Sequence, residues 1–97
     1  RVIDIITALK AQGFEVDVHD YFADAAEAKN AYNVDLLPSL DSASGYHCIV
    51  GAVAHDDYVI YDEADFARLA TPDAVIADVK GMWRKTNLDA NCRRWQL

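Results

Sequence analysis

Apolar and small residues fill positions Cys48–Ala54 without a charge and without alternation. A strand with one solvated face alternates, so this run predicts a strand that is covered on both faces. It ends abruptly in the polar residues His55–Asp57, and a second apolar run, Ala74–Ala77, ends in the same way in Asp78–Gly81. Two buried strands with a helical pattern between them form a βαβ unit, and ligands of open α/β sheets bind at the carboxyl ends of the strands. The two polar segments are therefore expected to border any site.

The rest of the pattern predicts short elements before and after these two runs. Before them we expect a helix with Val2, Ile5, Ile6 and Leu9 on one face, which ends at Gly13. An edge strand over Phe14–Val18 follows, and then a helix that is capped by Asp24 and Glu27 and ends near Asn33. A brief strand over Val34–Leu37 and a helical turn from Pro38 to Ala43 complete this part. Later we expect a helix capped by Asp62 and Asp65 with Phe66 and Leu69 inward, stopped by Thr71-Pro72, then irregular chain over residues 81–91 and a last strand over Arg93–Leu97.

Length and charge narrow the functional classes. The 97 residues suit one domain, and no stretch is long and apolar enough for a membrane span or reads as a signal peptide. Residues 1–79 have a net charge of −11 and residues 80–97 one of +4. An acidic body argues against a nucleic-acid-binding protein. The basic segment, with Trp83 and Trp95, suits a compact anion such as a phosphorylated metabolite, or it neutralises its own acidic domain.

Several short motifs, in order and at their spacing, carry a resemblance over nearly the whole chain. They are Val2-Ile-Asp-Ile-Ile6 with Gly13, Glu15-Val-Asp-Val-His-Asp20, Glu27-Ala-Lys29 with Tyr32, Ala52-Val-Ala-His-Asp56, Asp78-Val-Lys-Gly81 and Trp95-Gln-Leu97. Together they resemble the carboxy-terminal, UDP-binding domain of the UDP-glucose/GDP-mannose dehydrogenase family. The pieces Ala-His-Asp and Asp-Val-Lys-Gly look most like the branch that oxidises UDP-N-acetylhexosamines (GlcNAc or GalNAc).

The resemblance implies an α/β fold with three layers, α/β/α, and a mostly parallel, Rossmann-like sheet that lacks the family's first strand. Residues 1–97 would be a UDP-binding domain that is truncated at its amino-terminal side, since the chain starts at Arg1 without a Met or a helix cap. The parent protein would be a cytoplasmic, homo-oligomeric enzyme of polysaccharide biosynthesis that uses NAD to oxidise the sugar to the uronic acid. NAD would be bound by parts absent here, so we expect this chain alone to be inactive.

The resemblance assigns one binding residue. Lys80 lies where the family places an Arg or Lys that contacts the nucleotide sugar, and a cation suits a diphosphate at a strand end. Gly81, His55 and Asp78 are weaker candidates for substrate binding. The family's nucleophilic Cys lies in a Gly-rich motif that this chain lacks, so neither Cys48 nor Cys92 is assigned a catalytic role, and no cofactor or metal ligand is assigned.

Alternative interpretations remain open for the conspicuous polar and aromatic residues. His55–Asp57 is a metal site or acid–base pair, or a solvated strand end, which is the commoner case; a third metal ligand at suitable spacing is missing. Asp78 is better suited to orienting a loop than to chemistry. Trp83 and Trp95 have two interpretations: they stack on a base, or, as is more common, they pack in the core or in a subunit interface.

The chain as a whole also has two alternative functions. It is a free-standing α/β binding or regulatory module for a phosphorylated ligand, or a structural module that assembles a larger oligomer.

Overall fold

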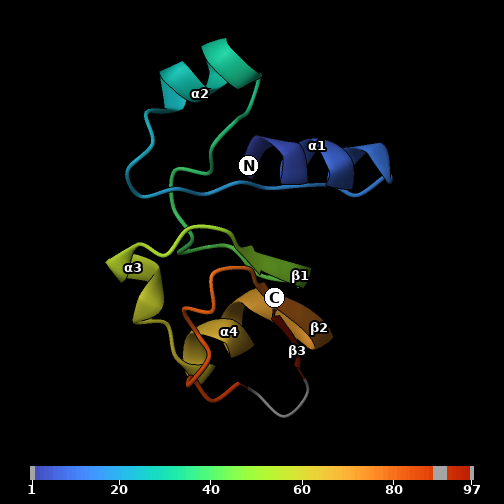
Figure 1. Cartoon of the computed structure of the whole chain (residues 1–97), viewed down its shortest axis with the longest axis vertical. Helices are drawn as coiled ribbons and strands as arrows, with labels where there is room; N and C mark the ends of the chain where they lie inside the picture. The colour runs from blue at the N-terminus through green and yellow to red at the C-terminus, as the bar shows by residue number, and fades with distance from the viewer. Residues whose placement is uncertain (1, 89–91, 97) are drawn as a thin grey trace. The chain divides into compact units, whose positions relative to one another are not determined.

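The computed structural model describes residues 2–88 and 92–96, and the chain divides into two compact units, Arg1–Ser42 and Ala43–Leu97 (Figure 1). The first unit contains two helices, and the second contains two short helices and a three-stranded parallel sheet. The predicted α/β class, with a parallel Rossmann-like sheet, is therefore confirmed.

The helices of the first unit begin and end where the sequence predicts. Helix α1 covers Val2–Ala11 and buries Ile6, and the amide of Gly13 (φ +90°) donates to Lys10 O at 3.0 Å just after it. Helix α2 covers Ala25–Tyr32, and the side chain of its N-cap residue Asp24 accepts a hydrogen bond from the amide of Glu27 at 3.0 Å. The helix ends at Asn33, whose φ of 55° is left-handed. Cap residues therefore fix the ends of both helices.

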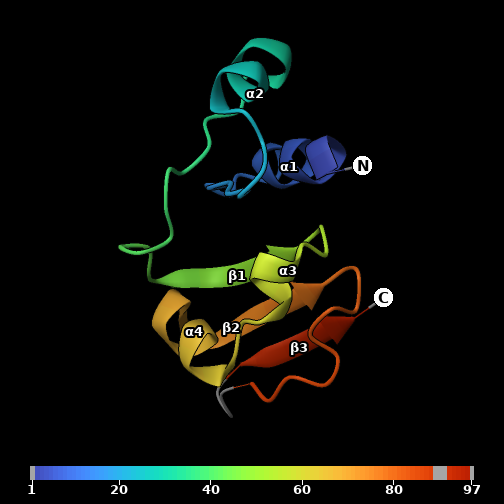
Figure 2. The same cartoon turned by 90° about the vertical axis from the view of Figure 1, so that its left-hand side faces the viewer.

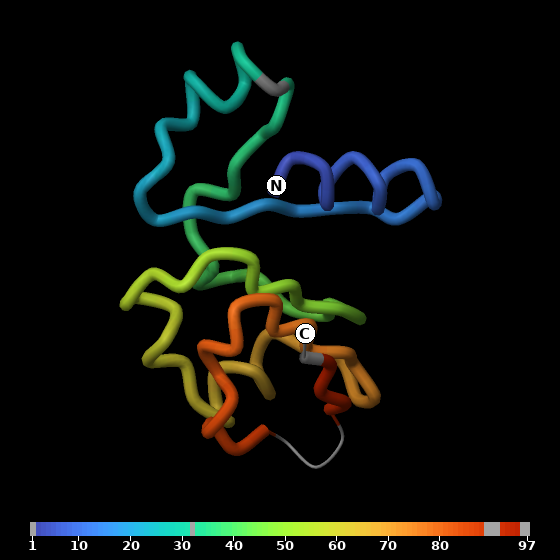
Figure 3. The backbone as a smooth tube through the Cα atoms, in the orientation of Figure 1, coloured from blue at the N-terminus to red at the C-terminus, as the bar shows by residue number. Residues whose placement is uncertain are grey.

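Three predicted elements over residues 14–43 are wrong. After α1 the chain turns and runs back beside the helix (Figure 3), but Phe14–Val18 is not a regular strand, and Phe14 is 62% exposed. One isolated parallel bridge joins Val18 to Leu36, with Leu37 N donating to Val18 O at 2.7 Å. A strand needs a continuous partner, and the brief predicted strand over Val34–Leu37 supplies a single bridged residue. The turn after Pro38 is not helical either: it forms bends in which Ser39 Oγ accepts from the amide of Asp41.

The second unit holds the sheet. Its strands are β1 (Tyr46–Gly51), β2 (Ala70–Asp78) and β3 (Arg93–Gln96), side by side in the order β1-β2-β3 and all parallel (Figure 2). The second apolar run and the last strand were thus predicted correctly, except that residues 89–91 and 97 lie outside the described part of the chain. Strand β2 starts earlier than predicted, directly after a helix that ends at Leu69, and takes in Thr71-Pro72.

The organising strand differs most from its prediction. Strand β1 starts at Tyr46 and ends at Gly51, so Ala52–Ala54 lie outside it, and its Cys48 is exposed. In the described sheet β1 pairs with β2 alone, and Gly51 is the one buried residue of this strand. The continuous apolar run therefore does not mean that β1 is covered on both faces here.

The core of the second unit joins both its helices to the sheet. Helix α3 (Asp56–Val59), which the sequence did not predict, contributes Tyr58, and α4 (Glu63–Leu69) contributes Phe66. Strand β2 adds Ile76, and the loop after it adds Trp83. Asp62 and Asp65 form the predicted capping box at the start of α4, with both hydrogen bonds present. Because this cluster includes the loop after β2, the loop is built into the fold.

Candidate functional site

The carboxyl ends of β1 and β2 lie at one edge of the sheet. Gly51, the last residue of β1, is the register partner of Asp78, the last residue of β2. The chain after β2 stays attached to β1, since the amide of Val79 donates to Gly51 O at 3.1 Å. The segments that follow these strands, which contain His55 and Lys80, therefore start from adjacent points, as expected of parallel strands.

Asp78 holds the loop that follows it. Its side chain is 1% exposed, and its two carboxylate oxygens accept hydrogen bonds from the amides of Met82 (3.0 Å) and Trp83 (2.9 Å). A buried carboxylate costs free energy unless it is hydrogen-bonded, and here both oxygens have backbone donors. Asp78 therefore orients the loop of residues 79–86, the role that the sequence favoured for it over chemistry.

Trp83 anchors the same loop in the core. Its ring is 3% exposed, packs edge-on against Phe66 with centroids 4.9 Å apart, and its Nε1–H donates to Tyr58 O at 2.7 Å. Gly51 makes room for it, because a Cβ built on Gly51 would lie 2.5 Å from the indole. This side chain packs in the core and is not available to stack on a base, which decides between the two interpretations of Trp83.

Arg94 forms hydrogen bonds with the far end of the loop. Arg94 of β3 donates from its guanidinium to Arg84 O at 2.7 Å and also to Thr86 O. These are backbone carbonyls at the end of the turn, so a cation there complements their partial negative charge. The loop is thus held by a carboxylate at its start, an indole in its middle and a guanidinium at its end.

Lys80 and Gly81 lie at the start of this loop. Lys80 is exposed, and Gly81 takes a φ of 70°, a left-handed conformation that glycine adopts at little cost. The amide of Gly81 donates to Asp78 O at 3.3 Å, which closes a tight turn around Lys80. The strongest predicted site residue is therefore a solvent-accessible cation on a fixed turn, directly after a buried strand.

His55 lies at the N-cap of α3. Its side chain is half-buried, its ring centroid is 6.3 Å from that of Tyr58, and its carbonyl accepts from the amides of Tyr58 and Val59. Tyr58 O is also the acceptor for Trp83, so the segment that carries His55 is connected to the loop that carries Lys80. Within residues 2–88 and 92–96, no group of three or more His, Cys, Asp or Glu side chains is placed to hold a metal ion.

The two cysteines differ in their surroundings. Cys48 is exposed at the edge of the sheet, yet partial desolvation by neighbouring atoms raises the pKa of its thiol above the ordinary value. Cys92 is half-buried against the core cluster of the second unit. Since the thiolate is the nucleophile, a raised pKa leaves Cys48 less reactive at neutral pH than a free cysteine.

The comparison with known proteins agrees with these observations. The model of the UDP-glucose/GDP-mannose dehydrogenase family, UDP binding domain, matches residues 1–85. The chain belongs to this family. A curated relative, Protein CapL of Staphylococcus aureus, is 32% identical over 97 residues, which are 100% of this chain and 22% of CapL. The chain thus spans about a fifth of the length of that relative.

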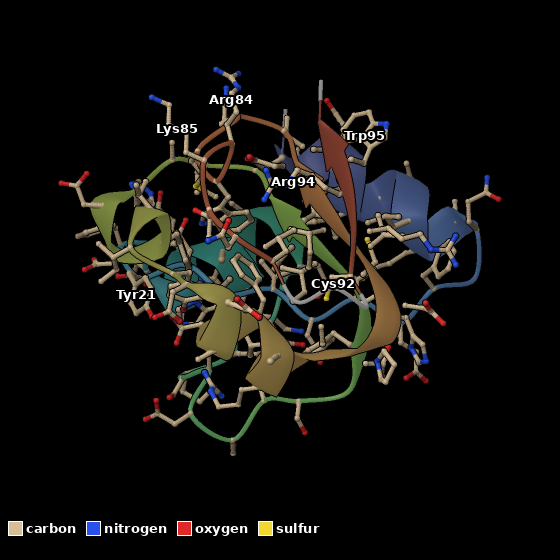
Figure 4. The ribbon with its side chains drawn as sticks, turned by 90° about the horizontal axis from the view of Figure 1, so that it is seen from below. Tyr21, Arg84, Lys85, Cys92, Arg94 and Trp95 are labelled. Carbon is tan, nitrogen blue, oxygen red and sulfur yellow. The ribbon has the colours of Figure 1, made fainter. Side chains whose placement is uncertain are left out.

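The sequence did not assign separate roles in the site to Arg84 and Arg94. The sequence did show an excess of positive charge after residue 79, but charge alone does not separate a loop-holding Arg94 from an exposed Arg84. Figure 4 shows the difference, since the side chains of Arg84 and Lys85 project outward whereas Arg94 lies against the loop.

No helix among the described residues is long and apolar enough to cross a membrane.

Proposed function

We propose that this UDP-binding domain contributes to substrate binding in an NAD-dependent UDP-N-acetylhexosamine 6-dehydrogenase of polysaccharide biosynthesis. The parent enzyme is a cytoplasmic homo-oligomer that oxidises the sugar C6 alcohol to the carboxylate. The observation that supports this best is the family match over residues 1–85, which includes Lys80 and the loop that presents it.

Lys80 contacts the nucleotide sugar in this proposal. A diphosphate is a compact anion, and Lys80 is an exposed cation at the carboxyl end of β2, where ligands of open α/β sheets bind. Gly81 supports the turn, and His55 lies on the neighbouring segment as a weaker contact. Asp78 acts through the loop, because both of its oxygens already accept backbone hydrogen bonds.

The oxidation itself needs groups from elsewhere in the parent protein. Hydride transfer requires that NAD and the sugar be held together, and this chain is assigned neither a nicotinamide site nor a catalytic nucleophile. When bound, NAD supplies the hydride acceptor. The domain by itself is therefore expected to bind UDP-sugars but to form no NADH.

Steady-state NADH formation by the full-length protein tests this function. We expect turnover with UDP-N-acetylglucosamine or UDP-N-acetylgalactosamine at a kcat/KM well above that for UDP-glucose and GDP-mannose. A preference for UDP-glucose would contradict the assignment to the UDP-N-acetylhexosamine branch, but it would be consistent with membership of the family. Binding of UDP-sugars without NADH formation would instead favour the binding-module interpretation, and turnover by the isolated 97-residue chain would contradict the assignment of catalysis to other parts.

A further inference from the structure

The loop of residues 81–86 presents one side chain whose position the fold sets closely. Arg84 lies in the middle of the turn, its amide donates to Gly81 O at 3.3 Å, and its carbonyl accepts from Arg94. With Trp83 immediately before it buried at 3% exposure, the backbone of Arg84 is fixed on both sides. The side chain nevertheless points to solvent (Figure 4).

The guanidinium of Arg84 folds back over Gly81. A Cβ built on Gly81 would lie 2.5 Å from Arg84 Nη2 and 3.2 Å from its Cζ. The absence of a side chain at Gly81 is thus what lets the guanidinium approach the backbone next to Lys80. The guanidinium of Arg84 therefore lies over the glycine that directly follows Lys80 in the chain.

The charge of Arg84 is not neutralised within the described chain. No acidic side chain in residues 2–88 and 92–96 forms an ion pair or hydrogen bond with its guanidinium. Arg94 differs, because its guanidinium is occupied by Arg84 O and Thr86 O. An exposed guanidinium on a fixed turn, with no acidic partner among the described residues, has donors available for an anion such as a phosphate.

We propose that Arg84 is a second diphosphate-binding residue, which acts with Lys80 on the UDP moiety across Gly81. This inference rests on the proposed function. The planar guanidinium donates two parallel hydrogen bonds to phosphate oxygens, whereas Lys80 provides a compact point charge. The pair therefore matches an anion with two adjacent phosphates. Because the guanidinium and the ammonium differ in geometry, they also fix the direction in which the diphosphate binds.

The test compares the affinities of UDP and uridine for the full-length protein, with Lys85 as the matched control, since Lys85 is exposed on the same turn. Arg84→Gln is expected to weaken UDP binding roughly ten- to a hundredfold, the effect of losing a charge-assisted contact, and to leave uridine binding unchanged. Arg84→Lys should recover part of the affinity, and Lys85→Gln should stay within about twofold of wild type. The substrate KM should rise with the UDP dissociation constant, while the KM for NAD does not change.

A second pair of variants tests the geometry. Gly81→Ala would push the guanidinium away and strain the backbone, whereas Gly45→Ala imposes similar strain (φ +79°) with no atom within 4 Å of the new Cβ. We expect Gly81→Ala alone to weaken UDP binding. Wild-type UDP affinity in Arg84→Gln, with weakened binding in Lys80→Gln, would overturn the role of Arg84 and leave the proposed function intact. If the wild-type protein bound neither UDP nor UDP-sugars, both would be wrong.

Discussion

The indole Nε1–H of Trp83 donates to the carbonyl oxygen of Tyr58 at 2.7 Å, which ties the loop after β2 to α3. The same carbonyl also accepts from the amide of Tyr61 at 3.0 Å. This acceptor therefore joins three segments of the second unit. Any movement of the Lys80 loop would break a buried hydrogen bond, so the loop is expected to behave as part of the core.

Replacing Trp83 measures how strongly that connection contributes to stability. Trp83→Phe removes the donor but leaves Tyr58 O bonded to Tyr61, so the hydrogen-bond loss is about 0.5–1.5 kcal/mol. The smaller ring also leaves a void in the core, and together we expect a destabilisation of roughly 2–4 kcal/mol. Chemical denaturation followed by circular dichroism checks this.

Trp95 provides the matched control, because it is 48% exposed whereas Trp83 is 3% exposed. Trp95→Phe is expected to change the free energy of unfolding by less than about 0.5 kcal/mol. Equal losses for the two variants would mean that the Trp83 hydrogen bond and its packing contribute little.

A double-mutant cycle tests the contact between Gly51 and Trp83. In Gly51→Ala the new Cβ would lie 2.5 Å from Cζ3 and 2.7 Å from Cη2 of the indole, so we expect overpacking to cost about 1–3 kcal/mol. Phenylalanine has neither of these two atoms. The cost of Gly51→Ala should therefore fall in the Trp83→Phe background, and additive losses would show that another contact, such as Met82 Cε at 2.6 Å, dominates.

The sequence predicted helix ends better than strand pairing. The caps at Asp24 and Asp62 are local, because each side chain bonds an amide three residues away, and both were correct. The strand predicted for Phe14–Val18 depended on a partner far along the chain, and it forms one bridge. Alternation reports a preference for extended chain but not the presence of a neighbour.

The positions of Lys80 and His55 in the chain could be predicted, whereas the side-chain contacts around them could not. Placing Lys80 and His55 after two parallel strands needed only the rule on strand ends, and the register of Gly51 with Asp78 agrees with it. The position of Arg84 over Gly81 and the hydrogen bonds from Arg94 to the loop depend on side-chain directions, between residues that are 3 and 10 positions apart in sequence. Periodicity carries no information on such contacts.

Cys48 offers a prediction on pH dependence. Desolvation disfavours the charged thiolate and raises the pKa, so at a given pH below that pKa a smaller fraction is reactive than in a free cysteine. Alkylation of Cys48 by iodoacetamide, followed by peptide mass spectrometry, should have its midpoint above that of a cysteine in an unfolded peptide. A midpoint below that of the peptide would instead indicate an activated nucleophile.

Enzyme activity gives the control for Cys48. Because Cys48 is assigned no catalytic role, Cys48→Ser should keep kcat and the KM for the UDP-sugar within about twofold of wild type, a free-energy change near the 0.5 kcal/mol typical of surface substitutions. A loss of kcat of several orders of magnitude would contradict this.

The last prediction concerns Lys80, the exposed cation directly after β2. In the full-length enzyme, Lys80→Ala should remove a charge-assisted contact with the nucleotide sugar and weaken substrate binding roughly ten- to a hundredfold. The KM for NAD and the unfolding midpoint should hardly change, because Lys80 is solvent-exposed and is not a member of the buried core cluster of Tyr58, Phe66, Ile76 and Trp83. The loss should shrink as salt rises, since ions screen exposed charges. Steady-state kinetics at low and high salt, with Lys85→Ala as the control of equal charge, measures each of these effects. Wild-type kinetics in Lys80→Ala would remove Lys80 from the site, and equal losses in Lys80→Ala and Lys85→Ala would show a general effect of positive charge in place of a specific contact.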